Sequence, residues 1–333
     1  MQRALTLARM AHPLAVAPNP QVGAVLVHQG KIIGEGYHHA RGRLHAEREC
    51  FASVKPLHKP LVRHSTLYVT LEPCCHHGLT PPCVQAILEE GVPTVVVGCQ
   101  DPNPLVKGKG IATLRAAGVK VVSGVLEEEC YHIAHTFMVQ HRYHRPYVLL
   151  KWAMSSDGFV DAYRSPGQPA VKLSNPFTQL LVHRLRSRYH GILVGGNTVR
   201  QDRPQLTNRL WSGGSPRPIA LSHQPLQHLI STYDNPRRWL FPTTTHLPTL
   251  LQELLQQGYY RIMVEGGPQL LQQFIKAGLW DAARVEVAPF ALGQGVPAPQ
   301  LLQAQLKGTE NYGTHHIYHY LNSLPAKVPA VKG

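Results

Sequence analysis

The chain has 333 residues, of which 43% are hydrophobic and 16% are charged. This length predicts two domains, and this composition excludes a disordered protein. The formal net charge of +14 suits an anionic partner such as a phosphorylated metabolite, a dinucleotide or a nucleic acid. The basic residues are scattered without a long basic run, which weighs against nucleic-acid binding.

Two features bear on the compartment. No apolar stretch approaches the length of a membrane span, and the N-terminal segment lacks the continuous apolar core of a signal peptide. The six cysteines include a metal-like grouping rather than a disulfide framework, which indicates a reducing environment. We therefore expect a cytoplasmic protein without a membrane segment.

Short strands and helices alternate along the first half. After a helix at 2–11, strands are expected at 22–27 and 31–37, joined as a hairpin by a turn at 28–30, and at 66–71, 94–98 and 119–122. Further helices are expected at 45–51, 83–90 and 110–117. This alternation predicts a largely parallel sheet with helices on both faces.

Three soft ligands in this half, His45, Cys74 and Cys83, predict a zinc site. Cys74 follows the strand at 66–71, while His45 and Cys83 each begin a helix. The carboxyl ends of strands and the N-termini of the next helices share one rim of an α/β sheet, so the three side chains can converge. Zinc with three protein ligands keeps a fourth position for water and brings the pKa of that water toward about 7.

Glu47 lies two residues after His45, and we interpret it as the catalytic proton shuttle. A carboxylate at this place can move protons between water and a leaving amine, as hydrolytic deamination requires. A structural zinc site is the alternative interpretation. It would take a fourth protein ligand, which Cys75, His76 or His77 could supply.

The motifs HAE, TLEPCCHHGLTPPC and QDPNPLVKGKG resemble the deaminase half of the RibD family of bifunctional riboflavin-biosynthesis enzymes. Eight residues separate Cys74 from Cys83, whereas tRNA adenosine and nucleoside cytidine deaminases have two residues between their cysteines. The resemblance implies that Leu79 stands where the family usually has a basic residue, so a charged contact to the substrate is lost or supplied from elsewhere. It also implies five substrate contacts: Asn19, His38, His76, Asp101 and Asn103.

The second half begins after a helix expected from about 125 to 143, which predicts domains at 1–144 and 145–333. Its strands are expected at 147–153, 191–194, 217–221, 239–241, 260–264, 284–288 and 315–321. Its helices are expected at 174–189, at 247–257 and from 268 to 277. The turn at 265–267, Glu-Gly-Gly, suits a phosphate, because glycine allows close backbone approach and a helix N-terminus favours an anion. The alternative is a tight strand-to-helix turn without a ligand.

The segments KWAMSSDG, ILVGGNTVRQDRPQLTNR, VEGGPQLL and APFALGQG are similar to the reductase half of the same family, which has a fold like that of dihydrofolate reductase. The resemblance implies NADPH binding by Ala153, Lys172, Thr198, Asp202, Ser222, Gly267, Pro268, Gln269, Leu270 and Leu271. It implies substrate contacts from Arg186, Leu206, Arg209 and Glu265. Ala170 and Lys172 replace the serine and tryptophan of many family members.

These observations together predict an α/β protein with a cytidine-deaminase-like three-layer domain followed by a dihydrofolate-reductase-like α/β domain. The predicted function is zinc-dependent deamination of a phosphorylated diaminopyrimidine, then NADPH-dependent reduction of its ribosyl side chain. The expected partners are these small molecules, not nucleic acid or a membrane, and the resemblance implies a homo-oligomer. The rival hypotheses are a nucleic-acid base deaminase with a binding module and a non-catalytic protein scaffolded by zinc.

Overall fold

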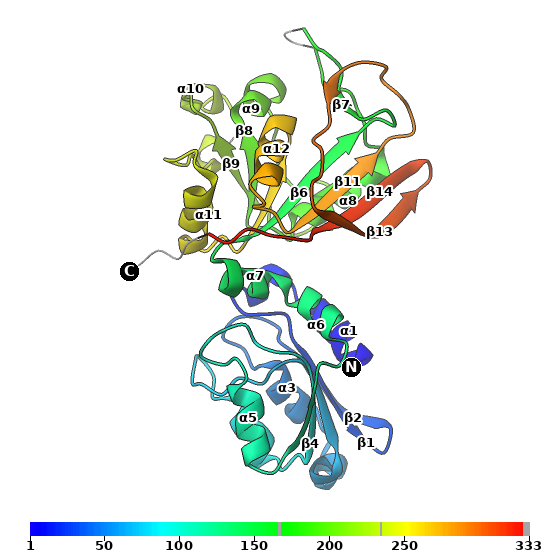
Figure 1. The fold of residues 1–333 in the computed structure, drawn as a ribbon, viewed down its shortest axis with the longest axis vertical. Coiled ribbons are helices and arrows are strands. Elements are labelled where there is room, and N and C mark those ends of the chain that lie inside the picture. The colour runs from blue at the N-terminus through cyan, green and yellow to red at the C-terminus, as the bar shows by residue number, and fades with distance from the viewer. Residues whose placement is uncertain (166–167, 234, 329–333) are drawn as a thin grey trace. The chain divides into compact units, whose positions relative to one another are not determined.

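The computed structural model describes residues 1–165, 168–233 and 235–328. The chain forms two compact units, Met1–Arg142 and Tyr143–Gly333, which are coloured from blue to green and from green to red in Figure 1. Within the described residues, no helix has the length and apolarity that a membrane crossing needs.

The first unit is built on a five-stranded sheet in the order β2-β1-β3-β4-β5. Its strands are β1 (Gly23–His28), β2 (Lys31–Tyr37), β3 (Thr66–Leu71), β4 (Thr94–Cys99) and β5 (Lys120–Ser123). β3, β4 and β5 are parallel, but β1 is antiparallel to both of its neighbours. The hairpin expected from 22–27 and 31–37 is confirmed, and its turn at Gln29 and Gly30 has positive φ at both residues. The expectation of a largely parallel sheet is wrong for the pair of β1 and β3, because β3 runs in the same direction as β2 and adds to the other edge of β1.

Helices cover both faces of this sheet, as expected. They are α1 (Gln2–Met10), α2 (Pro13–Val16), α3 (Ala46–Ala52), η1 (Pro56–His64), α4 (Cys83–Glu89), α5 (Lys109–Ala116), α6 (Glu127–Ile133) and α7 (His135–Tyr143). Side chains alternate along β1, so Leu26 packs in the cluster that contains α3 residues while Val25 packs with α1 residues. Figure 1 shows α3 and α5 on one side of the sheet and α1 and α6 on the other.

The second unit contains a seven-stranded sheet in the order β13-β14-β11-β6-β10-β8-β9. Its strands are β6 (Tyr147–Met154), β8 (Gly191–Gly195), β9 (Arg217–Leu221), β10 (Arg261–Glu265), β11 (Ala282–Val287), β13 (Ala304–Tyr312) and β14 (His315–Asn322). The five strands from β11 to β9 are parallel, and β14 and β13 continue the sheet antiparallel. A separate two-stranded sheet joins β7 (Phe159–Asp161) and β12 (Val296–Pro297).

The two faces of the larger sheet differ in chemistry. The helices of the second unit are α8 (Pro176–Arg186), α9 (Gly196–Asp202), α10 (Gln227–Ile230), η2 (Pro236–Arg238), α11 (Leu247–Gln256) and α12 (Pro268–Lys276). On one face, Leu150 and Val264 pack in an apolar cluster with residues of α11 and α12. On the other face, Glu265, Lys151 and Arg284 stand side by side on β10, β6 and β11. The second face therefore carries charged groups inside the fold.

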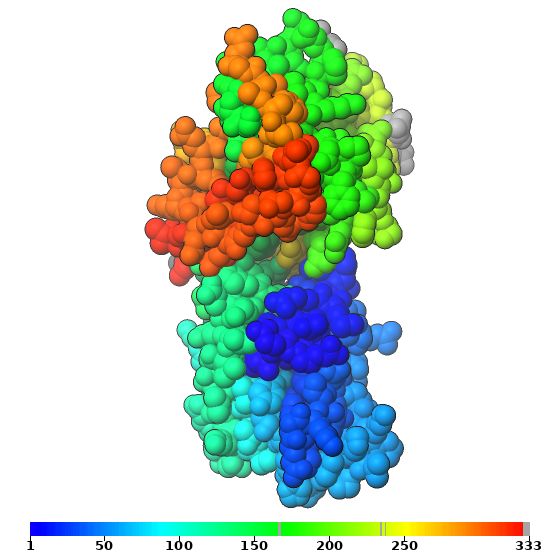
Figure 2. All heavy atoms as spheres, turned by 90° about the vertical axis from the view of Figure 1, so that its right-hand side faces the viewer, coloured from blue at the N-terminus to red at the C-terminus, as the bar shows by residue number. Residues whose placement is uncertain are grey.

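Two expected elements differ from the structure, and some elements of the structure, β13 among them, were not expected. The helix at 125–143 is divided into α6 and α7 at Ala134. The strand at 239–241 is reduced to one bridge between Leu240 and Ile219, because Pro242 has no N–H to extend the ladder. β13 was not expected, since almost all of its residues are exposed and its sequence lacks apolar alternation. Figure 2 shows this hairpin of β13 and β14, in orange and red, on the surface of the second unit.

Candidate metal centre and cofactor pocket

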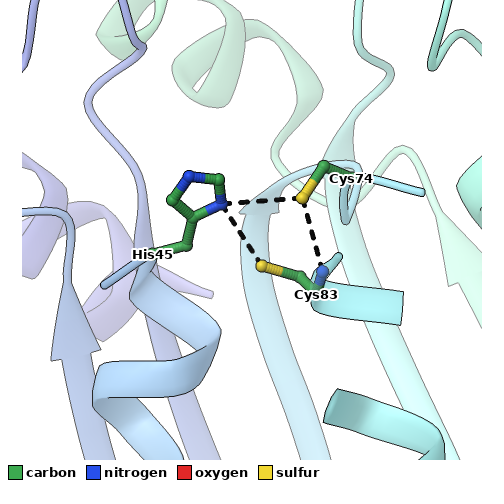
Figure 3. A group of neighbouring side chains, drawn as sticks. All are labelled: His45, Cys74 and Cys83. Atoms are coloured by element: carbon green, nitrogen blue, oxygen red, sulfur yellow. Dashed lines mark hydrogen bonds between the residues drawn. The ribbon is translucent and has the colours of Figure 1, made fainter. Parts of the chain in front are cut away.

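Three predicted ligands meet at one end of the first unit's sheet. His45 directly precedes α3, at its N-cap position, and Cys83 is the first residue of α4. Cys74 follows the end of β3 by three residues. Figure 3 shows the His45 ring and the two sulfur atoms pointing toward a common centre. The convergence that the sequence predicted is present.

The spacing of the three donor atoms fits a zinc ion. His45 Nδ1 lies 3.5 Å from Cys74 Sγ and 3.4 Å from Cys83 Sγ. Tetrahedral zinc with ordinary Zn–N and Zn–S bond lengths places its ligand atoms about 3.6 Å apart. In the part of the chain that the structure describes, these residues form the single group of His, Cys, Asp and Glu side chains close enough to hold a metal ion.

The two thiols favour a cation between them. The Cys83 thiol donates a hydrogen bond to Cys74, which is the main reason why the pKa of Cys74 falls to about 4. The same hydrogen bond, with burial, raises the pKa of Cys83. Two thiolates can therefore exist side by side only if a positive ion compensates them, and a divalent metal does this.

Thr80 is a further residue at this centre, and the sequence analysis did not identify it. Its Oγ1 lies 3.3 Å from His45 Nε2. Because Nδ1 faces the sulfur atoms, Nε2 carries the ring proton and donates it to Thr80. This contact fixes the ring orientation and leaves Nδ1 free to bind a metal.

Glu47 is buried beside the three ligands, with 4% of its surface exposed. Burial, together with the negative charge of Cys74, raises the pKa of its carboxyl group. The carboxyl also interacts with the Cys83 thiol and with His45. A buried carboxyl group that touches the ligand set, and is not one of its three members, is placed for proton transfer.

Asn19 and His38 form a chain of hydrogen bonds that leads to the residue before His45. His38 Nδ1–H donates to the Leu44 carbonyl at 3.0 Å, so Nε2 accepts from the Asn19 amide at 3.1 Å. The His38 ring also lies edge-on to the His45 ring, with centroids 5.3 Å apart. The structure therefore brings two of the predicted substrate contacts next to the centre.

Asp101 and Asn103 shape the loop that follows β4. Asp101 Oδ1 accepts the Asn103 N–H at 2.8 Å, and Asn103 Oδ1 accepts the Leu105 N–H at 3.1 Å. Burial raises the pKa of Asp101 to about 7. The loop is attached to the metal-ligand segment by Glu72, whose buried carboxylate accepts backbone N–H groups of Asp101, Gly108 and Ile111. Nothing in the sequence around Glu72 indicates this role.

His76 and Leu79 lie on the loop between the two cysteines, and both are exposed. Leu79 exposes 77% of its surface. The position where the family usually has a basic residue is thus open to solvent in this chain.

The second unit has a pocket of about 330 Å³ at the carboxyl ends of β8 and β9, beside the start of α12. Five of the residues predicted to bind NADPH line it: Thr198, Ser222, Gly267, Gln269 and Leu270. Gly266 and Gly267 both have positive φ, and a Cβ atom at Gly266 would lie 3.0 Å from Thr198 Cγ2. Glycine is needed where the turn approaches Thr198 so closely.

The other predicted cofactor residues do not line this pocket. Ala153 is the last residue but one of β6, and Lys172 is exposed on the loop before α8. Asp202 forms an ion pair with Arg164 at 2.7 Å. Pro268 begins α12, and Leu271 belongs to the buried apolar cluster. These five positions therefore stay predictions from resemblance.

Three of the four predicted substrate residues of the second unit lie next to Thr207, and Glu265 is joined to them through Arg186. Arg186 donates to the Thr207 carbonyl at 2.8 Å and to Glu265 at 3.0 and 3.1 Å. Arg209 contacts the Thr207 hydroxyl, and Leu206, which precedes Thr207 in the chain, is buried.

Glu265 also binds Lys151, at 3.2 Å, which the sequence analysis did not predict. Burial opposes its ionisation, but Arg186 and Lys151 lower the pKa of Glu265 to about 2. The carboxylate is therefore ionised at neutral pH and held by two cations.

Comparison with known proteins assigns each half to a family. Residues 1–99 match the family model of the cytidine and deoxycytidylate deaminase zinc-binding region. Residues 146–318 match the model of the RibD C-terminal domain. The second match covers more than half of the chain.

Relatives and solved structures match both halves together. The chain is 35% identical to the riboflavin biosynthesis protein RibD of Aquifex aeolicus, over 94% of this chain and 95% of that protein. It is 34% identical to the protein of the same name from Escherichia coli, over 88% of each. A diaminohydroxyphosphoribosylaminopyrimidine deaminase/5-amino-6-(5-phosphoribosylamino)uracil reductase from Thermotoga maritima superposes with a TM-score of 0.82, at 30% identity over 97% of each chain. Acinetobacter baumannii RibD superposes with a TM-score of 0.79, at 29% identity over 96% of this chain and 97% of that one.

Proposed function

The chain belongs to the RibD family, and on this basis we propose which of its residues carry out the two reactions of a bifunctional riboflavin-biosynthesis enzyme. It has a zinc-binding deaminase domain and an NADPH-dependent reductase domain. We assign the deaminase to the unit that ends at Arg142 and the reductase to the unit that begins at Tyr143, close to the division expected at residue 144.

The first substrate is 2,5-diamino-6-(5-phospho-ribosylamino)pyrimidin-4(3H)-one, the class of compound that the name of the Thermotoga relative describes. Water replaces its 2-amino group, and ammonia leaves. The observation that carries this assignment is the group of His45, Cys74 and Cys83 with the buried carboxyl of Glu47 beside it. These are the parts that hydrolytic deamination of a pyrimidine needs.

The deaminase residues act as follows in our proposal. A zinc ion bound by His45, Cys74 and Cys83 would act as a Lewis acid and would make water a nucleophile near neutral pH. Glu47 takes a proton from the attacking water and delivers it to the 2-amino nitrogen as the C–N bond breaks.

Five residues would hold the first substrate against this centre. Asn19 and His38 are supported by their hydrogen-bonded chain to Leu44, and Asp101 and Asn103 by the loop that they shape. His76 is supported by the resemblance and by its place between the two cysteines.

The reductase domain reduces the ribosyl side chain of 5-amino-6-(5-phospho-ribosylamino)uracil to ribityl, and NADPH supplies the hydride. We propose that the pocket beside α12 holds the cofactor, with its pyrophosphate near Gly267 at the helix N-terminus. Arg186 and Arg209, close to Thr207, would bind the substrate phosphate through charge-assisted hydrogen bonds. Leu206 and Glu265 complete this substrate site.

The partners of the enzyme are small molecules, and we propose phosphorylated pyrimidines rather than nucleic acid. The excess of basic residues suits substrates that both carry a phosphate. All six cysteines are free thiols, which supports a cytoplasmic location. Self-association is proposed from the family resemblance.

Two linked assays test this function on the purified protein. Ammonia release is measured with the diaminopyrimidine substrate, and NADPH oxidation is measured before and after that step. We expect NADPH oxidation only with the deaminated product. Guanine and cytosine serve as control substrates, and ammonia release from either of them instead would support the nucleobase-deaminase rival.

A further inference from the structure

The pocket at the ends of β8 and β9 contains one side chain with a permanent charge. Among its lining residues, Arg200 of α9 is the only Lys, Arg, Asp or Glu. The remaining walls are formed by glycines, leucines and neutral polar side chains, with His223 as the other ionisable group. An anionic part of a ligand in this pocket would therefore meet Arg200.

Two hydrogen bonds hold the guanidinium group of Arg200 in place. One Nη1–H donates to Asn197 Oδ1 at 3.1 Å, and one Nη2–H donates to Ser222 Oγ at 3.2 Å. Arginine has five N–H donors, so three are left for a ligand. Over the described parts of the chain, no carboxylate pairs with Arg200. Its charge is oriented but not neutralised.

Gly196 leaves the room that this arrangement needs. A Cβ atom at Gly196 would lie 2.5 Å from Ser222 Oγ and 3.2 Å from Arg200 Nη1. Any larger residue would displace the hydroxyl or the guanidinium group. The Gly195-Gly196 turn after β8 is thus compatible with Arg200 and Ser222 standing together in the pocket wall.

These groups belong to other elements than the turn proposed for the pyrophosphate. Gly267 precedes α12, while Ser222 follows β9 and Arg200 lies on α9. NADPH carries a second phosphate, on the 2′-oxygen of its adenosine ribose, and NADH lacks it. A phosphate monoester is the anion that an arginine fork with a neighbouring hydroxyl binds well.

We propose that Arg200, oriented by Ser222 and Asn197, binds the 2′-phosphate of NADPH and makes this chain select NADPH over NADH. The proposal rests on the proposed function, which places the cofactor in this pocket. An arginine near the adenosine ribose serves the same purpose in other dinucleotide-binding folds. Arg200 is thereby a specificity-determining residue that takes no part in hydride transfer.

Direct binding measurements test this proposal without using enzyme activity. All four tryptophans lie in the second half of the chain, at positions 152, 211, 239 and 280. Energy transfer from tryptophan to the reduced nicotinamide therefore reports binding to the reductase unit. The variant is Arg200→Met, which keeps much of the side-chain length and removes the charge. Arg203→Met is the matched control, because Arg203 is exposed at the end of the same helix and does not line the pocket.

In the wild type we expect NADPH to bind more tightly than NADH. Arg200→Met should raise the Kd for NADPH about 10- to 100-fold and change the Kd for NADH less than about twofold. Arg200→Lys, which keeps the charge but not the fork, should give an intermediate loss, and Arg203→Met should match the wild type.

If Arg200→Met weakened the binding of NADPH and of NADH equally, or kept the wild-type selectivity, the role of Arg200 would be overturned, while the assignment of the pocket would stand. Failure of the wild type to bind either nucleotide would overturn the pocket assignment and this inference with it. The two failures are therefore distinguishable.

Discussion

The carboxylate of Glu72 accepts the backbone N–H of Ile111 at 3.1 Å, although 39 residues separate them in the chain. It also accepts the N–H of Gly108 at 3.0 Å and that of Asp101 at 3.3 Å. Because Glu72 lies two residues before the ligand Cys74, one buried side chain connects the metal centre to the loop that carries two proposed substrate contacts. We regard it as a positioning residue.

Glu72→Ala is expected to loosen this loop while zinc stays bound. Three N–H groups, two of them buried, would lose their acceptor, at a cost of roughly 3 kcal/mol in local stability. Amide hydrogen exchange should accelerate in residues 101–111, and the KM for the diaminopyrimidine should rise. Glu89→Ala, at an exposed glutamate of α4, is the control. Unchanged exchange together with an unchanged KM would exclude this role for Glu72.

Removing one metal ligand should remove the zinc ion. Cys83→Ser is expected to leave little zinc after purification, because a serine hydroxyl replaces a thiolate ligand. Cys75→Ser is the matched control, since the Cys75 sulfur lies 3.8 Å from the Leu105 carbonyl and outside the ligand group. Elemental analysis should find about one zinc per chain in the control and in the wild type. Loss of zinc from Cys75→Ser would indicate a different ligand set.

The reductase unit should lose stability in acid, because the carboxylate of Glu265 becomes protonated. This carboxylate is held ionised by Arg186 and Lys151, which, against burial, lower its pKa from 4.5 to about 2. A depressed carboxyl pKa contributes stability above the unfolded-state pKa, and this contribution disappears as the pH falls toward 2. We expect Glu265→Gln to be less stable than the wild type at pH 7, with the difference shrinking by about 2 kcal/mol at pH 3. Urea unfolding followed by tryptophan fluorescence measures this, and an equal difference at both pH values would contradict it.

The buried pair of Arg145 and Asp281 should be strongly stabilising to the second unit. Both side chains are fully buried, and two hydrogen bonds of 2.7 and 2.8 Å join them. Arg145→Met would leave the buried charge of Asp281 without its cation, although the Val148 N–H still donates to it, so the unfolding free energy should fall by about 3–5 kcal/mol. Adding Asp281→Asn should recover part of the loss. If Arg145→Met alone were as stable to urea as the wild type, the pair would not stabilise this unit.

Much of the metal centre could be predicted because its signals are local in the sequence. A strand followed by Pro-Cys, and a cysteine that begins a helix, already place Cys74 and Cys83 at the same rim. The proximity of Glu47 to the centre follows from its place two residues after His45, in the first turn of α3. The hairpin of β1 and β2 could also be predicted, but the antiparallel pairing of β1 with β3 could not, because the sequence does not show which strand of the hairpin β3 joins.

Contacts between distant residues explain what the sequence analysis missed. Glu72 belongs to a motif, but its partners lie 29 to 39 residues away. Thr80 reaches His45 across 35 residues. Arg200 stands inside a motif without any local sign that it faces a pocket. In each case only the folded chain shows which group the side chain meets.

Replacement of Glu47 by glutamine tests the central assignment most directly. Glu47→Gln keeps the shape of the side chain but cannot accept the proton that Glu47 is proposed to move. Ammonia release from the diaminopyrimidine should fall by about 10²- to 10⁴-fold, while zinc content and NADPH oxidation with the deaminated product stay unchanged. Glu49→Gln, on the same helix, should behave like the wild type. Ammonia release by Glu47→Gln at the wild-type rate would contradict the mechanism proposed for this enzyme.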